Sequence, residues 1–469
     1  MDSAFGAIGV FTLCFVLSAL CATVLAEPGD RKVSAQFVLA GLFMACLKIW
    51  LIRQTPQWLD TPLDAVKYQL NAEALTAHWH GEAVNSQLYR LDGLTKIFGQ
   101  DHWSLDAYLP YSSVFGTHEW LYAAYLAVWA HITPHWPVWA TYSNAALAAL
   151  FPAVSFGIAR ELGSTTRIAA LGGTVALIDP SAAVNGAWLL KDTLACWCVL
   201  IAIWAALVIL RKPRFMLVLL LGSALGILGS VRFLGLMAVL LAILVLLPAL
   251  LVRRRILTSG SLLVACLYGL SLFSTLNSLP VEGVGSVLER PVVALKAILF
   301  GQVETLSVSR RADMASSAID DTVVDWYTRL SESPLKASAT AASRTLFAPY
   351  PWVIITEGLN FRNGIELYYL GIVLWIICLP GIFWAIVQAL RNPSFPAAFV
   401  GLVLGACLGA YVIFYGEWST RQRVFMLPVF FALAAIGWVD LVQRLGFWKD
   451  PAASGGCADK SNPRLTRRS

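Results

Sequence analysis

Long, nearly uncharged runs of apolar residues recur along the chain and limit its fold more than any other feature. About 20 consecutive apolar residues are enough for a helix to cross the hydrocarbon core of a bilayer. In lipid, only helices and closed barrels satisfy every backbone N–H and C=O group, and runs of this length favour helices. We predict about 11 membrane spans, at residues 4–26, 33–52, 137–159, 167–187, 192–210, 214–230, 232–252, 256–276, 365–390, 395–415 and 424–443.

The composition agrees with a protein that lies largely in a membrane. Of the 469 residues, 58% are hydrophobic and 13% are charged, whereas soluble domains carry about 25% charged residues. We therefore expect an all-α polytopic membrane protein with one transmembrane module over residues 1–444. The basic tail, residues 445–469, is expected to be disordered and cytoplasmic. Short basic loops account for the net charge of +6, so this charge points to no nucleic-acid partner.

Lys and Arg in short loops predict which ends of the spans face the cytoplasm. If successive spans alternate in direction, the basic turns all fall on one side. They contain Arg31, Lys32, Arg160, Arg167, Arg211, Lys212, Arg214, Arg253, Arg254, Arg255 and Arg391. Two long loops, 53–118 and 277–364, then lie on the extracytoplasmic side. A further apolar segment, 119–135, is short; if it crossed the membrane, the first two spans would be inverted relative to the rest.

The first long loop carries acidic residues close to the point where it leaves the membrane. Asp60 and Asp64 flank the start of a helix that the apolar spacing after Pro62 predicts. Tyr68 follows Asp64 by one turn, so both side chains project from the same helix face. An aspartate at a helix start is also explained by capping of the first backbone N–H groups. A catalytic role and a capping role are therefore both open for Asp64.

Another acidic residue lies at the start of a span, in the stretch NGAWLLKDTLACWC at residues 185–198. A charge in the membrane costs roughly 2.5–3.5 kcal/mol on insertion scales, so Lys191 and Asp192 need a partner, water or an interface. Asp192 suits a helix N-terminus by its charge, and Lys191 can extend toward anionic groups. The plainer interpretation is a lysine that reaches for water beside an aspartate that stabilises the helix start.

Three arginines are predicted near the same side of the membrane. Arg232 separates two apolar runs without any other turn signal, and Arg421 and Arg423 precede the last span. Guanidinium groups bind phosphate oxygens in pairs, so an outer face with several cations suits a lipid-linked phosphate. Each arginine by itself is also explained as an interfacial anchor.

These motifs together resemble the GT-C superfamily of integral-membrane glycosyltransferases, specifically the bacterial relatives of protein mannosyltransferases and lipid A aminoarabinose transferases. The resemblance covers roughly residues 50–440, in pattern more than in identity. Its segments are DAVKYQLNAEAL, which begins at Asp64, the consecutive spans from residue 142 to 181, WLLKDTLACWCVLIAIWA, and YGEWSTRQRVFMLPVFFALAA. The family often has two adjacent acidic residues in its first outer loop, whereas this chain has Leu63-Asp64 and a separate Asp60.

The resemblance implies an inverting enzyme that transfers a sugar from a polyprenyl-phosphate donor to an acceptor at the outer face of a bacterial inner membrane. Asp64 is then the expected base, and Asp60 and Asp192 are further catalytic candidates that orient the acceptor or a metal ion. The expected substrate-binding residues are Tyr68, Lys191, Arg232, Arg421 and Arg423. Some members of the family use a divalent metal ion and others do not, so the cofactor stays open. The sugar, the acceptor and the oligomeric state stay open as well.

Two other classes of membrane protein fit parts of the sequence. An O-antigen-type polysaccharide polymerase or ligase would use undecaprenyl pyrophosphate and basic residues of the second long loop, Arg290, Arg310 and Arg311. A transporter or flippase would place broken helices and polar residues at the membrane midplane, often in repeated halves. The predicted charges gather at one interface and no repeat is seen, which disfavours the transporter.

Overall fold

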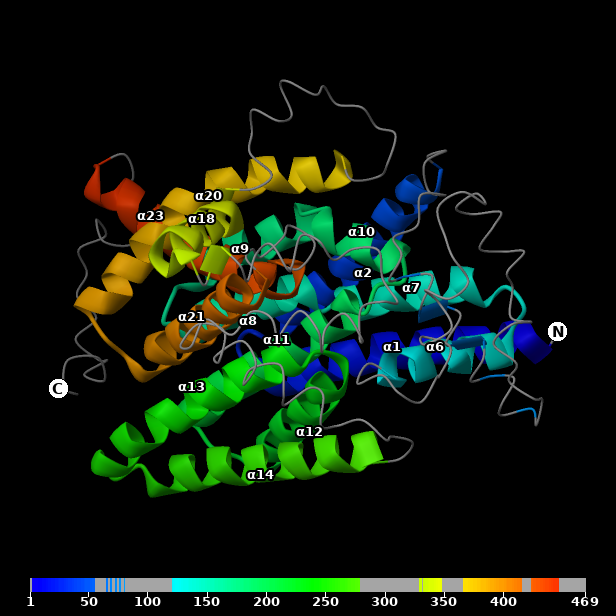
Figure 1. Cartoon of the computed structure of the whole chain (residues 1–469), viewed down its shortest axis with the longest axis horizontal. Helices are drawn as coiled ribbons and strands as arrows, with labels where there is room; N and C mark the ends of the chain where they lie inside the picture. Colours follow the sequence, from blue (N-terminus) through cyan, green and yellow to red (C-terminus); the bar gives the residue numbers. More distant parts are fainter. Residues whose placement is uncertain are drawn as a thin grey trace.

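The computed structural model describes residues 2–54, 120–278, 332–347, 366–415 and 423–446, together with Arg329, Leu330 and scattered residues between 65 and 80. The elements in this part of the chain are helical (Figure 1). They are α1 (Asp2–Leu25), α2 (Arg31–Arg53), α6 (Trp120–Ile132), α7 (Trp136–Ala148), α8 (Phe151–Glu161), α9 (Thr166–Ile178), α10 (Ser181–Ala187), α11 (Asp192–Arg211), α12 (Phe215–Val231), α13 (Phe233–Val252), α14 (Ile256–Ser278), α18 (Pro334–Phe347), α20 (Glu366–Arg391), α21 (Phe395–Tyr415), the 3-10 helix η3 (Val424–Met426) and α23 (Leu427–Arg444).

The chain is a multi-pass membrane protein. In the described part, 10 helical segments are long and apolar enough to cross a bilayer, and each coincides with one of the predicted spans. The remaining predicted span, 214–230, is α12, which has 17 residues. The short apolar segment at 119–135 contains α6, a helix of 13 residues. The predicted loops 53–118 and 277–364 and the tail 445–469 lie largely outside the described residues.

Two of the spans are made of broken helices. The segment Thr166–Ala187 consists of α9 and α10, which are separated at Asp179 and Pro180. This confirms that Pro180 interrupts the helix, because proline lacks an N–H and its ring clashes with the preceding turn. The segment Trp136–Glu161 likewise consists of α7 and α8.

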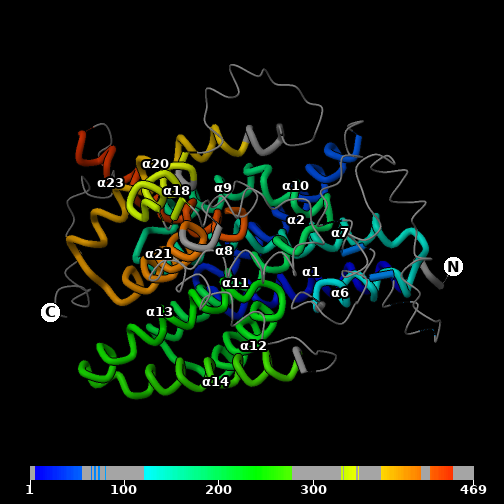
Figure 2. The backbone as a smooth tube through the Cα atoms, in the orientation of Figure 1, coloured from blue at the N-terminus to red at the C-terminus, as the bar shows by residue number. Residues whose placement is uncertain are grey.

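The helix α11 lies at the centre of the bundle. Nearly all of its residues are buried, and it contacts helices from both halves of the chain, among them α7, α8, α12, α21 and η3. Large apolar side chains elsewhere are exposed, for example Phe215 (73%) and Val252 (83%). Such a surface is unfavourable in water but suits contact with lipid tails. In Figure 2, α12, α13 and α14 lie together along the lower edge of the molecule.

Ion pairs bring three of the basic turns together at one end of the bundle. Arg160, near the end of α8, pairs with Asp30 in the α1–α2 turn at 2.7 Å. Arg211, at the end of α11, pairs with Glu161 at 3.0 Å. These contacts place the turn between the first two spans at the same end of the bundle as the turns after α8 and α11. The first two spans are therefore not inverted relative to the later ones, as they would be if the segment 119–135 crossed the membrane.

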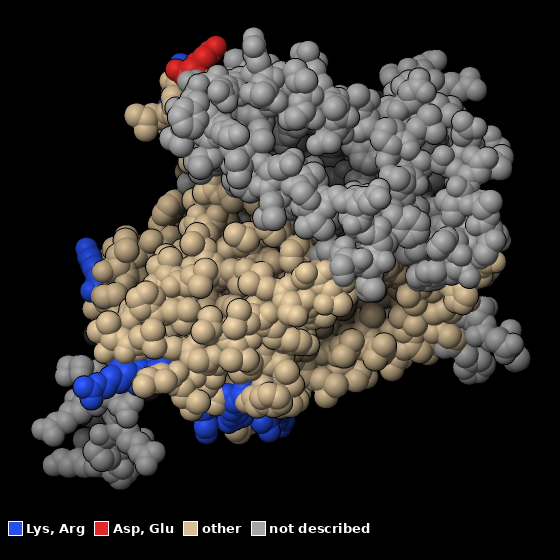
Figure 3. All heavy atoms as spheres, turned by 60° about the horizontal axis from the view of Figure 1, so that its bottom comes forward, with Lys and Arg blue, Asp and Glu red and all other residues tan. Residues whose placement is uncertain are grey.

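Two further turns lie at this same end. Arg255, in the α13–α14 turn, donates to the carbonyl of Leu210 at 3.3 Å, and its guanidinium lies 5.3 Å from the ring centroid of Phe395 at the start of α21. In Figure 3, Lys and Arg colour the left and lower margins of the face shown, and the broad surface between them is uncharged. We call the end of the bundle that contains these basic turns the basic end, and the opposite end, where α11 begins, the distal end.

Cysteine labelling tests the position of the basic end. Lys32, Lys212 and Asn392 are exposed residues in or beside three different turns. Single cysteines at these positions, in a Cys457→Ser background, are expected to react with a membrane-impermeant maleimide in inside-out vesicles and not in intact cells, since basic loops stay in the cytoplasm. Reaction of Lys32→Cys from the side opposite to Asn392→Cys would contradict the arrangement.

Candidate functional site

A buried ion pair lies at the distal end, where α11 begins. Asp192 is the first residue of α11, and Arg232 is the single residue between α12 and α13. Nη1 of Arg232 donates to Oδ1 of Asp192. The side chains are 12% exposed for Arg232 and 1% for Asp192, so each group replaces much of the hydration that the other loses. Arg232 forms the tight hairpin that the sequence predicts, and its guanidinium binds a carboxylate of the protein.

Two aromatic rings flank the guanidinium of Arg232. Its Cζ atom lies 5.8 Å from the ring centroid of Tyr411 in α21 and 5.3 Å from that of Phe425 in η3. A cation near an aromatic face is attracted by the ring quadrupole, more strongly where water is excluded. Residues from three separate elements, α11, α21 and η3, therefore define the position of this one guanidinium.

Arg423 lies close by, immediately before η3, and is 2% exposed. Its Cζ atom is 4.9 Å from the ring centroid of Trp375 in α20. The thiol of Cys196 contacts the carbonyl of Val424 at 3.6 Å, which docks η3 against α11. Burial lowers the pKa of Arg423 to about 10 because the charged form loses hydration. The guanidinium thus still carries its charge at neutral pH.

Lys191 and Tyr68 are also brought together. The Nζ atom of Lys191 lies 6.0 Å from the ring centroid of Tyr68. Tyr68 is 2% exposed and packs edge-to-face on Tyr122 of α6, with 5.2 Å between centroids. The first long loop therefore contributes at least this side chain to the distal end.

The turn that leads into Lys191 and Asp192 has an unusual backbone. Leu189 has φ +55°, a left-handed conformation that non-glycine residues adopt rarely. The N–H of Leu190 bonds to the carbonyl of Asn185 (3.1 Å), and the N–H of Leu189 to that of Gly186 (3.3 Å). This is the Schellman pattern that ends helices, with leucine in place of the usual glycine. The turn ends α10 and leads directly into α11, at a strain of about 1 kcal/mol or more.

A second polar group at this end was missed by the sequence analysis. Lys48 of α2 donates to the carbonyls of Leu177 and Asp179, at 2.6 Å each. The buried carboxylate of Asp179 accepts a hydrogen bond from the Ser181 hydroxyl at 3.0 Å. Ser181 and Arg423 in turn line the same small cavity, of about 10 Å³. A lysine inside the predicted span 33–52 was the available signal, because intramembrane charges are seldom without a role.

The other candidates cannot be placed. Asp60, Asp64 and Arg421 lie outside the described residues, as do Arg290, Arg310 and Arg311 of the alternative polymerase hypothesis. Within the described ranges, no group of three or more His, Cys, Asp or Glu side chains is arranged to hold a metal ion. Of the predicted site residues, Tyr68, Lys191, Asp192, Arg232 and Arg423 are described.

Chemically, the distal end offers cations at defined positions beside apolar and aromatic surface. Cations that are already in place can stabilise a developing negative charge without reorganisation, and they act more strongly where water is excluded.

No model of a known protein family matches the chain, and no curated protein does.

Proposed function

We propose that the chain is a membrane glycosyltransferase that moves a sugar from a polyprenyl-phosphate donor to an extracytoplasmic acceptor, in the inner membrane of a bacterium. The observation that carries the proposal is the buried Asp192–Arg232 pair at the distal end, flanked by Tyr411 and Phe425. A guanidinium at a defined position suits a phosphate leaving group, because its planar fork matches the phosphate oxygens.

The proposed reaction needs few groups. The acceptor hydroxyl oxygen attacks the anomeric carbon, the bond from that carbon to the phosphate oxygen breaks, and the hydroxyl proton passes to a carboxylate, which gives inversion. Asp64 is our proposed base, on the strength of the sequence resemblance. Lys191, Arg232 and Arg423 are the proposed phosphate-binding residues.

Asp192 takes a different role in this proposal. Its carboxylate already accepts from Nη1 of Arg232 and is 1% exposed. The guanidinium occupies Oδ1 of this carboxylate, and a general base must come within hydrogen-bond reach of the acceptor hydroxyl, which so enclosed a side chain does not. We therefore assign Asp192 to positioning Arg232 rather than to proton transfer.

The variant Arg232→Lys tests the proposal. It keeps a positive charge near Asp192 but loses the planar fork, and we expect transfer to fall about 100-fold or more, as when one oxyanion donor is removed. Purified protein in proteoliposomes would receive polyprenyl phosphates that carry different hexoses or pentoses, together with an envelope acceptor fraction. Release of polyprenyl phosphate would be followed by mass spectrometry.

Arg211→Lys is the matched control. Arg211 also pairs with carboxylates, Glu27 and Glu161, but at the basic end, so this variant is expected to retain transfer. Wild-type protein that releases no polyprenyl phosphate from any donor would contradict the proposal. Consumption of a pyrophosphate-linked oligosaccharide would instead favour the polymerase or ligase. Movement of an unaltered lipid between leaflets would favour a flippase.

A further inference from the structure

A long apolar groove lies between α20 and α21. The two helices are consecutive, but α20 packs on α23 whereas α21 packs on α13, so they separate beyond their shared turn (Figure 1). The resulting space has a volume of about 780 Å³. Phe430, Leu433 and Ile436 of α23 also line it.

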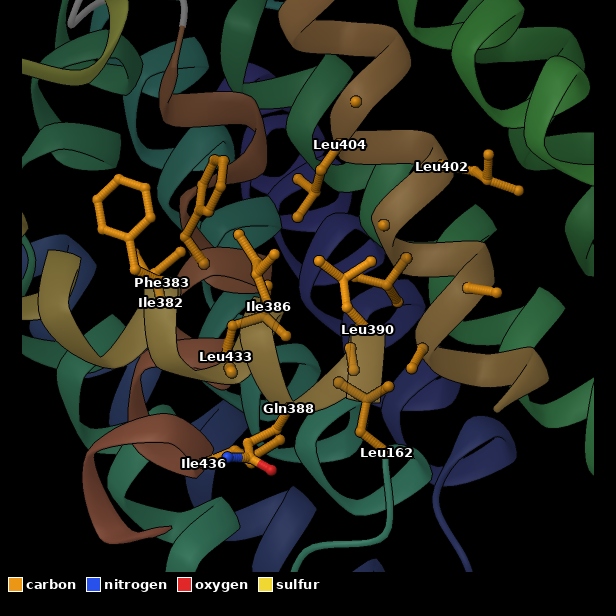
Figure 4. A pocket seen from close by; sticks show the side chains of 18 of the residues that line it. Leu162, Ile382, Phe383, Ile386, Gln388, Leu390, Leu402, Leu404, Leu433 and Ile436 are labelled. Atoms are coloured by element: carbon orange, nitrogen blue, oxygen red, sulfur yellow. The ribbon is translucent and has the colours of Figure 1, made fainter. Parts of the chain in front are cut away.

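The walls of the groove are almost entirely hydrocarbon. In Figure 4, Ile386 and Leu390 of α20 and Leu404 of α21 point into the space between the two helices. Ile386 is 41% exposed and Leu390 is 77% exposed. Because this surface belongs to membrane-spanning helices, the groove opens sideways to the lipid rather than to water.

The length of the groove exceeds one leaflet of a bilayer. The lining residues run from Trp375 of α20 to Asn392, the first residue after this helix, a stretch of about 25 Å at a helical rise of about 1.5 Å per residue. Half of the hydrocarbon core is only about 15 Å thick. An acyl chain of an ordinary phospholipid occupies one leaflet, so it would leave much of the groove unfilled.

Charge is distributed unevenly along the groove. Where the groove reaches the basic end of the bundle, the polar residues that line it are uncharged: Gln388, Asn392 and Ser394. The charged lining residue is Arg423, at the other end of the described lining, stacked on Trp375. A buried guanidinium beside apolar walls is complementary to a lipid with an anionic head, and phosphate oxygens match its donors.

We propose that this groove binds the chain of a single-chain, phosphate-headed lipid that is longer than one leaflet, with its head toward Arg423. The inference rests on the proposed function, to which it adds the place where the donor's lipid is held. A lipid would enter between α20 and α21 from the bilayer without passing through water, and its head would reach the end of the bundle where Arg232 lies.

Two exposed glycines provide a matched pair of variants. Gly405 of α21 lines the groove, and an added Cβ there meets no atom within 4 Å. Gly260 of α14 is not part of the lining, and a Cβ there also meets no atom within 4 Å. Gly405→Trp fills the groove, and Gly260→Trp places the same side chain on a helix that does not line it.

Native mass spectrometry with added lipids gives the readout. The probes are undecaprenyl phosphate, the short farnesyl phosphate and phosphatidylglycerol. We expect wild type to bind undecaprenyl phosphate better than the other two lipids. Gly405→Trp should bind it more than about tenfold more weakly, because burying two fewer methylene groups of a lipid already lowers affinity about tenfold. Gly260→Trp should stay within about twofold of wild type, as surface substitutions usually do. Gly401→Trp, also in the lining and facing open space, repeats the test if Gly405→Trp does not fold.

Several results would overturn the inference. Equal binding of undecaprenyl phosphate by wild type and a folded groove-filling variant would show that the lipid lies elsewhere. Equal binding of farnesyl phosphate or phosphatidylglycerol by wild type would remove the argument from length. The groove and the proposed function can fail separately. If the protein transfers sugar and Gly405→Trp binds undecaprenyl phosphate normally, only the proposal about the groove is wrong. If lipid binding depends on the groove but the wild-type protein transfers no sugar, only the glycosyltransferase proposal is wrong.

Discussion

Replacing Asp192 with alanine is expected to lower the free energy of unfolding by about 3–5 kcal/mol, because it leaves the charge of Arg232 buried without this carboxylate. The two side chains are 1% and 12% exposed, respectively, so water does not readily take the carboxylate's place. The measurement is unfolding of the purified protein in mixed micelles, by heat or by increasing denaturing detergent.

A double substitution separates the buried charge from a simple loss of packing. Asp192→Ala together with Arg232→Met removes both charges, and we expect it to recover much of the stability, since an uncharged pair needs no hydration. The surface pair Arg444–Asp440, at 2.9 Å and with side chains 52% and 35% exposed, is the control. Asp440→Ala also removes the hydrogen bond that Nε1 of Trp384 donates to this carboxylate at 2.6 Å, and it should lower stability by about 1–2 kcal/mol, less than Asp192→Ala. Equal effects of Asp192→Ala and Asp440→Ala would mean that the distal pair is solvated.

Replacing Gly437 with valine is expected to prevent α23 from packing on α20, with a loss of about 3 kcal/mol or more. A Cβ at Gly437 would overlap the carbonyl oxygen of Gly381. That obstacle is backbone within a helix, which cannot move aside as the end of a flexible side chain can. Close approach of backbones through small residues is a common way for membrane helices to associate.

The control for Gly437→Val is Gly260→Val in α14, where an added Cβ meets no atom within 4 Å. Folded protein would be measured by size-exclusion chromatography in mild detergent. Since α23 also lines the lipid groove, Gly437→Val should lose binding of undecaprenyl phosphate even in the fraction that folds. A Gly437→Val protein as abundant and as stable as Gly260→Val would show that the backbones of α20 and α23 do not approach closely at Gly381 and Gly437.

The spans, their turns and the break at Pro180 follow from the sequence, because the properties that produce them are local. Apolar length, the missing N–H of proline and the charges of short loops act within a few residues of their position. The same reasoning identified Lys191, Asp192, Arg232 and Arg423 as residues of one end of the bundle. The resemblance to GT-C glycosyltransferases, and with it the role of Asp64, stays a hypothesis that the transfer experiment addresses.

Only the tertiary structure decided which of these residues meet. The sequence predicts Asp192 and Arg232 as separate site residues but does not predict that they pair. It also does not predict the contact of Lys48 with the carbonyl of Asp179. The groove between α20 and α21 exists because each helix packs on a different partner. In water, an apolar stripe shows which face of a helix is buried. In lipid, the outward face is apolar too, so the pattern along the chain does not reveal the partner, and packing across distant segments decides it.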